Sequence, residues 1–378
     1  MTSIEIKIKF LLIRVIAPAI LKSIFIFFPR KEKTLLIVRS DGVGDYILFR
    51  NYLYFLKSSA KYKQHKICVL ENFISKDLAT HWDAEVVERF IWYSDGNFLK
   101  WELIKLLWDL QRLRTETIIY SNYSRKFTVD WLIDKVGAKN KIAVDGDCIN
   151  EPLAIKNKGN RYYSELLRVD AKPLHEFARN KQIFELITGE KCLVEKPVIE
   201  KHQLNLIRNY SIVIFAGAGH QHKTWAPSHF NRFCQRVIEE LKTPIILAGG
   251  NKDADRLKEI SEGIRAEFVS CKAELSLIEL CELIGGANLL ISGDTAAIHI
   301  AALLDIPAVC IVKGDLYGRF IPYPPGTSDH ITCVFPRNYH AAAKNYDQWS
   351  PFTINDVMID DVFNATAKAL TSLMENKN

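Results

Sequence analysis

Several features that mark specialised classes of protein are missing from this 378-residue sequence. Its eight cysteines are scattered and form no CxxC pair, so the sequence gives no sign of a zinc site or a redox dithiol. It also contains no Walker loop, no Ser-His-Asp set, no repeat and no low-complexity tract. We therefore expect a globular protein whose cysteines are reduced, as in the cytoplasm.

Charge is nearly absent from the body of the chain. The formal net charge is +6, but residues 1–33 carry seven basic and two acidic side chains, which leaves +1 for the other 345 residues. A nucleic-acid-binding protein needs basic side chains along a folded groove. The distribution argues against a nucleic-acid partner.

The N-terminal segment is apolar but contains no hydrophobic run long enough to cross a bilayer comfortably. Its apolar stretches include Phe10–Ile13 and Ile24–Phe28, and they are interrupted by Arg14, Lys22 and Arg30. No small-residue cleavage site follows them, so a secretory signal is also excluded.

Residues 1–33 instead predict an amphipathic, basic helix. On a helix, Lys7, Arg14 and Lys22 fall within about a quarter-turn of one another, and the cluster Arg30–Lys33 follows. We expect this leader to bind an anionic membrane surface, which would make the protein peripheral on the cytoplasmic face of the inner membrane. The alternative is a helix that packs its apolar side on the body of the protein.

After the leader, short β-rich runs alternate with helical patterns, which is typical of parallel sheets with crossover helices. The sequence predicts an α/β protein of two Rossmann-like domains, 34–200 and 201–350, that face a central cleft. A C-terminal helix within 351–378 is predicted to pack back on the first domain. The predicted strands are Leu35–Arg39, Lys66–Leu70, Val86–Trp92, Thr117–Tyr120, Lys141–Val144, Ser211–Phe215, Pro244–Ala248, Glu267–Ser270, Asn288–Ser292 and Ala308–Val312.

The first loop that could carry chemistry follows the first predicted strand and contains Asp41, Gly42, Gly44 and Asp45. It lacks the third glycine of a dinucleotide fingerprint, and Asp45 would place negative charge where a pyrophosphate needs exposed amides. An aspartate at the start of the helix predicted over Tyr46–Lys57 is stabilised as an anion, so it could accept a proton from a hydroxyl. Its other interpretation is an ordinary helix cap.

The second loop contains Gly217, Gly219 and Lys223 and leads to a helix that begins near Pro227. Its glycines allow close approach of the backbone, and the lysine offers a point charge suited to a phosphate oxygen. Trp225 is interpreted as a packing residue.

The third segment is Asp294, Thr295, Ala296 and His299, where a strand turns into a helix rich in small residues. Such a helix start leaves backbone amides accessible to an anion. Asp294 and Thr295 can cap the helix or contact a polar ligand, while a lone histidine on an apolar helix is more often a packed, hydrogen-bonded residue.

A fourth segment, Gly249 and Gly250 before another helix start, is expected to border the same site. Nothing in the sequence resembles a metal cluster, so no metal site is predicted.

Taken in this order, the four segments resemble glycosyltransferase family 9, the ADP-heptose:lipopolysaccharide heptosyltransferases, over about residues 34–325. The resemblance implies the two-domain GT-B architecture and an inverting, metal-independent transfer from a nucleotide-diphosphate sugar, such as ADP-heptose, to a lipid-linked or oligosaccharide acceptor. It implies no cofactor. One departure concerns the sugar: the family usually has glycine where this chain has Ala296.

The resemblance also assigns roles to residues. Asp45 matches the family's catalytic aspartate and would deprotonate the acceptor, with Asp41, Gly42 and Gly44 on the acceptor side. Lys223 matches a phosphate-contacting lysine, and Asp294, Thr295, Ala296 and His299 match the donor-side motif. Two alternatives stay open: a nucleotide-sugar epimerase of the same fold, and a non-catalytic member that binds nucleotide sugar or acts as a scaffold.

Overall fold

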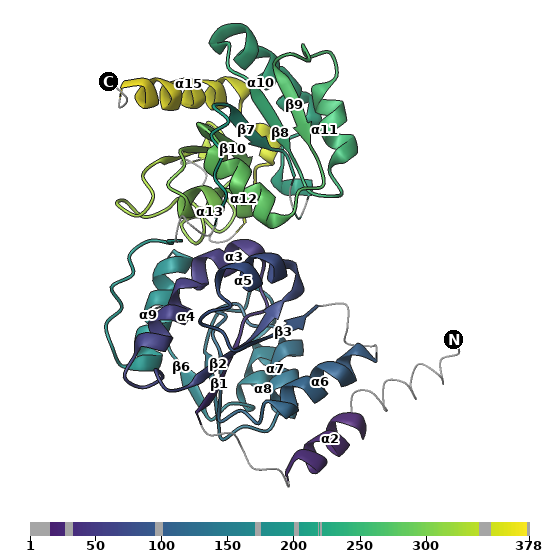
Figure 1. Ribbon diagram of the computed structural model, residues 1–378, viewed down its shortest axis with the longest axis vertical. Helices are drawn as coiled ribbons and strands as arrows, with labels where there is room; N and C mark the ends of the chain where they lie inside the picture. The colour runs from purple at the N-terminus through teal and green to yellow at the C-terminus, as the bar shows by residue number, and fades with distance from the viewer. Residues whose placement is uncertain are drawn as a thin grey trace, which may run out of the picture. The chain divides into compact units, whose positions relative to one another are not determined.

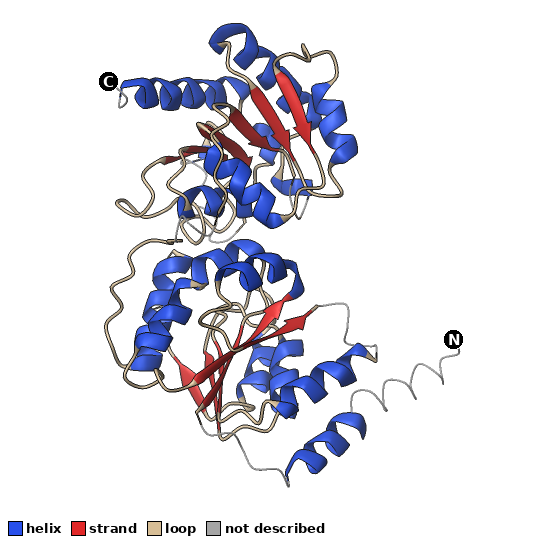
Figure 2. Cartoon of the chain, viewed as in Figure 1, coloured by secondary structure: helices blue, strands red, loops and turns tan. Residues whose placement is uncertain are grey.

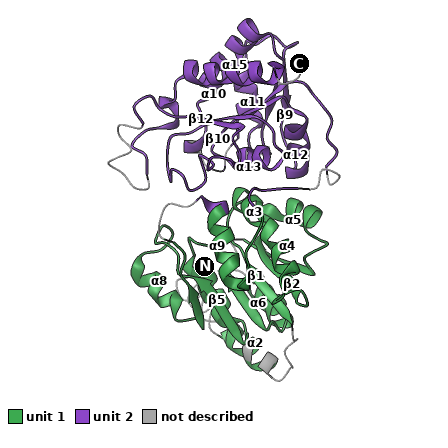
Figure 3. Cartoon of the chain, turned by 90° about the vertical axis from the view of Figure 1, so that its left-hand side faces the viewer, with its two compact units in different colours: residues 1–171, 178–194 green, residues 172–177, 195–378 purple. Residues whose placement is uncertain are grey.

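A computed structural model describes residues 16–26, 33–94, 101–170, 175–199, 204–217, 219, 221–339 and 349–375. The chain divides into two compact units (Figure 3). Unit 1 comprises Met1–Ala171 and Ala178–Val194, and unit 2 comprises Lys172–Phe177 and Glu195–Asn378. The second unit therefore begins at Glu195 and includes a short earlier segment, whereas the sequence analysis placed one boundary at residue 200.

Within the described residues, unit 1 contains a six-stranded parallel sheet with helices on both sides (Figures 1 and 2). Its strand order is β3-β2-β1-β4-β5-β6. The strands are β1 Thr34–Val38, β2 Lys66–Asn72, β3 Arg89–Tyr93, β4 Thr117–Tyr120, β5 Asn140–Val144 and β6 Glu165–Leu167. The helices are α2 Ala17–Ile26, α3 Val43–Phe49, α4 Asn51–Ser58, η2 Phe73–Ser75, α5 Lys76–Trp82, α6 Glu102–Arg112, α7 Phe127–Lys135, α8 Leu153–Asn160 and α9 Glu176–Thr188.

Unit 2 repeats this plan with the strand order β12-β11-β10-β7-β8-β9, again all parallel. Its strands are β7 Ile212–Phe215, β8 Ile245–Ala248, β9 Val269–Lys272, β10 Leu289–Gly293, β11 Ala308–Ile311 and β12 Ile331–Val334. Its helices are η5 Gln221–Lys223, α10 Pro227–Arg236, η6 Val237–Leu241, α11 Ala254–Ser261, α12 Leu277–Gly286, α13 Ala296–Leu303, η8 Ile354–Asp356 and α15 Ile359–Glu375.

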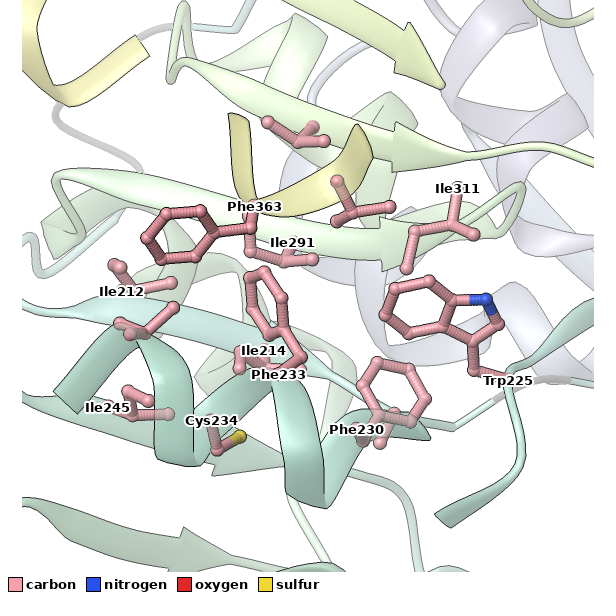
Figure 4. Close-up of a cluster of buried hydrophobic side chains, with 14 of the residues drawn as sticks. Ile212, Ile214, Trp225, Phe230, Phe233, Cys234, Ile245, Ile291, Ile311 and Phe363 are labelled. Atoms are coloured by element: carbon pink, nitrogen blue, oxygen red, sulfur yellow. The ribbon is translucent and has the colours of Figure 1, made fainter. Parts of the chain in front are cut away.

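The central strands read as continuous apolar runs because both of their faces are covered. All residues of β1, β4 and β10 are buried. In unit 1, the face that carries Leu36 and Val38 packs against α6 and α7. In unit 2, the face that carries Ile212 and Ile214 packs against α10 and α15 (Figure 4) and against α11.

All ten predicted strands are present, and two further strands were missed. The missed strands, β6 and β12, are each the last in their unit and lie at one edge of their sheet. An edge strand has one neighbour and is partly exposed, so β6 is short and β12 buries only one of its four residues. Their sequences therefore lack the apolar run that marks the central strands.

The C-terminal helix α15 does not do what the sequence analysis predicted. Its buried side chains Val362, Phe363 and Leu370 lie in the core of unit 2, where the helix contacts α10, β11 and β12 (Figure 4). The amphipathic pattern predicted the helix correctly, but it carried no information on which domain the apolar face covers. The prediction that it packs back on the first domain was wrong.

Of the predicted leader, residues 1–15 and 27–32 lie outside the described residues. The part between them forms α2, which packs against α6 and α7 of unit 1 (Figure 1). No helix in the described ranges has the length and apolar character needed to cross a membrane.

The structure describes all eight cysteines and shows each as a free thiol. Buried cysteines occur in both units: Cys68 and Cys192 in unit 1, and Cys234, Cys281 and Cys310 in unit 2.

Candidate functional site

Both sheets have the doubly wound strand order. The first three strands of each sheet are added outward on one side of the first strand, and the next three are added on its other side. In open α/β sheets of this kind, ligands bind at the carboxyl ends of the strands, where the order reverses. In unit 2 this point lies between β7 and β10, which pair directly. The loops after these two strands hold Lys223 and Asp294, so the fold brings two predicted donor-side residues together.

Lys223 and Asp294 form a loose ion pair, with the lysine Nζ 3.8 Å from the carboxylate Oδ2. Burial raises the pKa of the Asp294 carboxyl, Lys223 lowers it, and the nearby Asp315 raises it again. The lysine side chain remains 38% exposed. A cation that is accessible and held close to a helix start is suited to a phosphate group.

The position of Lys223 is fixed by the residues packed around it. A side chain at Gly293 would lie 2.3 Å from the backbone oxygen of Lys223, so glycine is needed for this approach. Thr224 donates to the backbone oxygen of Ala216 at 2.9 Å. Trp225 is fully buried beside Phe230 and Phe233 (Figure 4), which confirms its interpretation as a packing residue.

Thr295 is the N-cap of α13, and it accepts the backbone N–H of Ala297 at 3.3 Å. Its hydroxyl also lies 3.0 Å from that of Ser292. Ala296 is the first residue of the helix and is half-buried. The turn from β10 into α13 is therefore built as the sequence predicted, with Asp294 beside the helix start.

Sequence reasoning missed a second charged pair at this edge of the sheet. Lys313 and Asp315 follow β11, and the lysine Nζ lies 2.7 Å from the Asp315 carboxylate. Together with Lys223 and Asp294 they line one small pocket. The signal that could have found them is their place directly after a buried apolar strand, where the carboxyl ends of neighbouring strands meet.

In the two glycine loops of unit 2, the side chain of Asp253 explains why Gly217 and Gly249 are glycines. A methyl group at Gly217 would lie 2.3 Å from the carboxylate of Asp253, and one at Gly249 would lie 2.6 Å from its Cβ. The same carboxylate accepts the backbone N–H of Gly250 at 2.8 Å. These glycines make room for Asp253, whereas a side chain at Gly219 would meet open space.

His299 is a buried, hydrogen-bonded residue. Its Nδ1 lies 2.7 Å from the hydroxyl of Tyr323, whose ring also packs on His175. Burial, together with the charges of His175 and Lys223, lowers the pKa of His299 to about 3. The imidazole is therefore neutral at physiological pH, and the structure shows it supporting Tyr323.

In unit 1 the equivalent point lies between β1 and β4, which also pair directly. The helix after β1 begins at Val43, three residues earlier than predicted, so Asp45 lies inside its first turn. Its carboxylate accepts the backbone N–H of Gly42 at 3.3 Å, which is the geometry of a helix cap. Asp45 is half-buried, so its carboxylate remains accessible.

A buried arginine holds the loop after β1. Arg39 contacts the carboxylate of Asp41 at 3.1 Å and donates to the backbone oxygen of Ser121 at 3.1 Å. Glu71, at the carboxyl end of β2, is also buried, and burial raises its pKa well above the usual range although Arg39 opposes this. Asp41 and Asp45 raise the pKa of Glu71 as well, so the three carboxyl groups share one neighbourhood.

Three buried oxygen atoms near this loop have no hydrogen-bond partner among the described residues: Glu71 Oε2, Ser121 Oγ and Asn122 Oδ1. These oxygen atoms can accept hydrogen bonds from a polar ligand at this edge of the sheet. Sequence reasoning missed these residues, although each is a polar residue at or just after the end of a buried strand.

Over the described part of the chain, no group of three or more histidine, cysteine, aspartate or glutamate residues is arranged to hold a metal ion.

Comparison with known proteins gives the class of this protein. Residues 175–345 match the family model of glycosyltransferase family 9 (heptosyltransferase). The chain is 24% identical to lipopolysaccharide heptosyltransferase 1 from Campylobacter coli over 360 residues, which cover 86% of this chain and 96% of that protein.

Two solved structures share the fold. A glycosyltransferase of family 9 from Veillonella parvula superposes with a TM-score of 0.68 and 15% identity, covering 90% of this chain and 98% of that one. E. coli heptosyltransferase WaaC with ADP superposes with a TM-score of 0.66 and 17% identity, covering 89% and 99%. The two α/β units thus have the GT-B fold of these structures.

The chain is therefore a glycosyltransferase. Within that class it is heptosyltransferase-like, and its resemblance to glycosyltransferase family 9 is confirmed.

Proposed function

We propose that this protein transfers heptose or a related sugar from a nucleotide-diphosphate donor to a hydroxyl of lipopolysaccharide or another glycan, with inversion and without a metal ion. Unit 2 would bind the donor and unit 1 the acceptor. The observation that carries the proposal is the pairing of Lys223 with Asp294 beside the start of α13.

The donor side has the charge and the geometry for a diphosphate. Lys223 is accessible, and the first residue of α13 is small, so the backbone amide of Ala296 can approach an anion. These groups would offset the negative charge that develops on the leaving diphosphate, which a metal ion does in other transferases.

The chemistry of transfer balances within the proposed residues. The carboxylate of Asp45 accepts the proton of the acceptor hydroxyl, and the oxygen forms a bond to the anomeric carbon of the sugar. The bond from that carbon to the diphosphate breaks, and the electron pair leaves with the nucleoside diphosphate. A single displacement of this kind inverts the configuration at the anomeric carbon.

The acceptor side supports this role for unit 1. Asp41 lies in a loop held by the buried Arg39, and Asp45 lies in the first turn of the helix that follows, near buried oxygen atoms that can accept hydrogen bonds. Hydroxyl groups of a glycan can both donate to and accept from such atoms.

The names of the relatives support the substrates. One relative is named for lipopolysaccharide and one solved structure contains ADP. We infer that ADP-heptose is the donor to test first. We also infer that the protein acts on the cytoplasmic side of the membrane, where it would meet a lipid-linked acceptor. No cofactor is proposed.

The test measures release of free nucleoside diphosphate from ADP-heptose with and without a heptose-deficient lipopolysaccharide acceptor. We expect release only when both are present, and a loss of about 100-fold or more in kcat for Asp45→Asn, because the amide cannot accept the proton. Asp77→Asn is the matched control, since Asp77 also lies in the first turn of a unit 1 helix, α5.

The same assay separates the alternatives. Acceptor-independent conversion of the donor sugar would indicate an epimerase, and binding of ADP-heptose without turnover on any acceptor would indicate a scaffold. Full activity of Asp45→Asn would reject the assignment of the base.

A further inference from the structure

Two cysteines of unit 2 lie directly opposite each other in neighbouring strands. The register of β11 and β12 pairs Cys310 with Cys333. The structure describes all eight cysteines, and the other two that lie in strands, Cys68 and Cys271, have no cysteine opposite them. Among the described strands, this is therefore the one position at which two thiols are paired across a sheet.

Both cysteine side chains project from the same face of the sheet. Ile311 and Val334, the next residue along each strand, belong to the core that α10 and α15 cover, where Figure 4 labels Ile311. Side chains alternate between the two faces of a strand, so Cys310 and Cys333 both project from the opposite face. Their thiols are hydrogen-bonded to each other. The fold thus brings the two sulfur atoms together.

The two thiols differ in their access to solvent. Cys310 is fully buried, whereas Cys333 is half-buried on β12, an edge strand of the described sheet. A dissolved oxidant therefore reaches Cys333 first. Burial and the neighbouring Cys333 thiol raise the pKa of Cys310, so this thiol stays protonated until a reactive partner forms beside it.

A disulfide at this position would be strained. Paired residues of neighbouring strands lie about 4.8 Å apart, whereas the two Cβ atoms of a disulfide lie about 3.8 Å apart. Closing the bond would therefore draw β11 and β12 together by about 1 Å. Strained disulfides are readily reduced, and those that form in the cytoplasm are mostly transient or redox-sensing.

The cysteine pair lies beside the pocket on the proposed donor side. Residues 311–313 follow Cys310 directly, and they line this pocket together with Lys223 and Asp294. The charges of Lys223 and Asp294 also act on the Cys310 thiol, which lies near both. A shift of β11 towards β12 would therefore move one wall of the pocket and change how it fits a diphosphate.

We propose that Cys310 and Cys333 are a modification site, at which a peroxide converts the two thiols into a reversible disulfide that weakens donor binding. The disulfide requires no catalytic residue and is independent of the transfer reaction. Its effect on the donor rests on the proposed function.

The chemistry needs hydrogen peroxide as the only co-reactant. The sulfur of Cys333 attacks one peroxide oxygen, the O–O bond breaks, and the other oxygen leaves as water, so that Cys333 becomes a sulfenic acid. The sulfur of Cys310 then attacks the sulfur of Cys333, the S–O bond breaks, and a second water leaves. The two thiols lose two protons and two electrons in total, and one peroxide is reduced to two waters.

The experiment treats the folded, full-length protein with hydrogen peroxide, blocks the remaining thiols by alkylation and identifies disulfides by mass spectrometry. Lys313 and Arg319 lie between the two cysteines, so trypsin releases two peptides that only the disulfide joins. Additional cleavage after Glu282 separates Cys281 from Cys310. We expect the joined peptides in the oxidised wild type and their separation after treatment with dithiothreitol.

Two variants test the assignment. Cys333→Ser should form no disulfide at Cys310. Cys271→Ser is the matched control and should keep the disulfide, since Cys271 is exposed on β9, the other edge strand of the same sheet, and faces Leu247. Oxidation of Cys333 to a sulfinic acid without a link to Cys310 overturns the proposal, and so does a link that forms only in urea.

Calorimetric titration with ADP measures the effect on the donor side. We expect ADP to bind about tenfold more weakly to the oxidised than to the reduced wild type, and equally to both forms of Cys333→Ser. Equal affinity in both forms of the wild type, with the disulfide present, overturns the effect on the donor. If no form of the protein binds ADP, this effect fails together with the proposed function, while the peptides decide the disulfide separately.

Discussion

At the scale of single residues, the proposed donor side of unit 2 is a balanced set of charges. Lys223 faces Asp294, and Lys313 faces Asp315, within one small pocket. Each lysine is held by a carboxylate before any ligand arrives, which limits the side-chain entropy lost when a phosphate binds. The carboxylates also weaken the attraction of the pocket for an anion, so the two lysines act together.

The first prediction concerns Lys313. Lys313→Ala should weaken binding of ADP about tenfold, because it removes one cation and leaves the charge of Asp315 uncompensated beside the diphosphate. Isothermal titration calorimetry would measure the change. Lys258→Ala, on the exposed face of α11, is the control and should bind as the wild type does. An unchanged dissociation constant for Lys313→Ala would place the diphosphate elsewhere.

The second prediction is a pH dependence that comes from His299. Its pKa is about 3 in the folded protein against 6.5 for the ordinary side chain, so the unfolded chain binds the proton more tightly. The stability from keeping it neutral is complete above pH 6.5 and is lost as the pH falls, by about 2–3 kcal/mol at pH 4.5.

Thermal unfolding of the wild type and of His299→Asn at several pH values would measure this. The wild type should lose more stability than the variant between pH 6.5 and 4.5, since asparagine does not titrate. An equal loss of stability in both proteins would show that His299 does not control the fall in stability at acidic pH.

At the scale of helices and strands, α15 shows that a local pattern can predict a helix correctly without showing which domain its apolar face covers. The periodicity of the C-terminal segment marks a helix with one apolar face, and that helix exists. Its apolar face fills the core of unit 2, where the guanidinium of Arg236 lies 3.8 Å from the ring centre of Phe363.

The third prediction tests this placement. Phe363→Ala should destabilise unit 2 by about 3–5 kcal/mol, the usual cost of removing a buried phenyl ring. Urea unfolding followed by circular dichroism would measure it, with Met374→Ala as the control because Met374 is exposed near the end of the same helix. If Phe363→Ala left the unfolding midpoint unchanged, α15 would not be part of that core.

The same scale decides what could be predicted. The central strands and the loops after β1, β7 and β10 were found because a buried parallel strand is a continuous apolar run and its carboxyl end faces the ligand. Lys313, Arg39 and Asn122 were missed because only the strand order shows which loops are neighbours. Likewise, Gly217 and Gly249 are glycines because the Asp253 side chain packs against both of them, and no local sequence pattern could show this.

At the scale of the whole molecule, the chain is built from the same strand order twice. Each unit has its own sheet and core, and each reverses direction between its first and fourth strands. Ligand sites of the two units can therefore be examined separately.

The fourth prediction follows from this division. ADP should slow hydrogen exchange of backbone amides in the loops after β7, β10 and β11 and leave the loops after β1 and β4 unchanged, because a bound ligand stabilises the unit that holds it. Hydrogen–deuterium exchange with mass spectrometry would measure both sets in one sample. Protection confined to unit 1 would reverse the assignment of donor and acceptor sides.

The buried free thiols can report local opening of the structure. Cys68 and Cys192 are enclosed in unit 1, and Cys234, Cys281 and Cys310 in unit 2, so an alkylating reagent can reach each set only when the surrounding structure separates. Alkylation of the wild-type protein, followed by mass spectrometry of its peptides, would thus measure how often each unit opens. It would show which of the two units opens first under heat or denaturant.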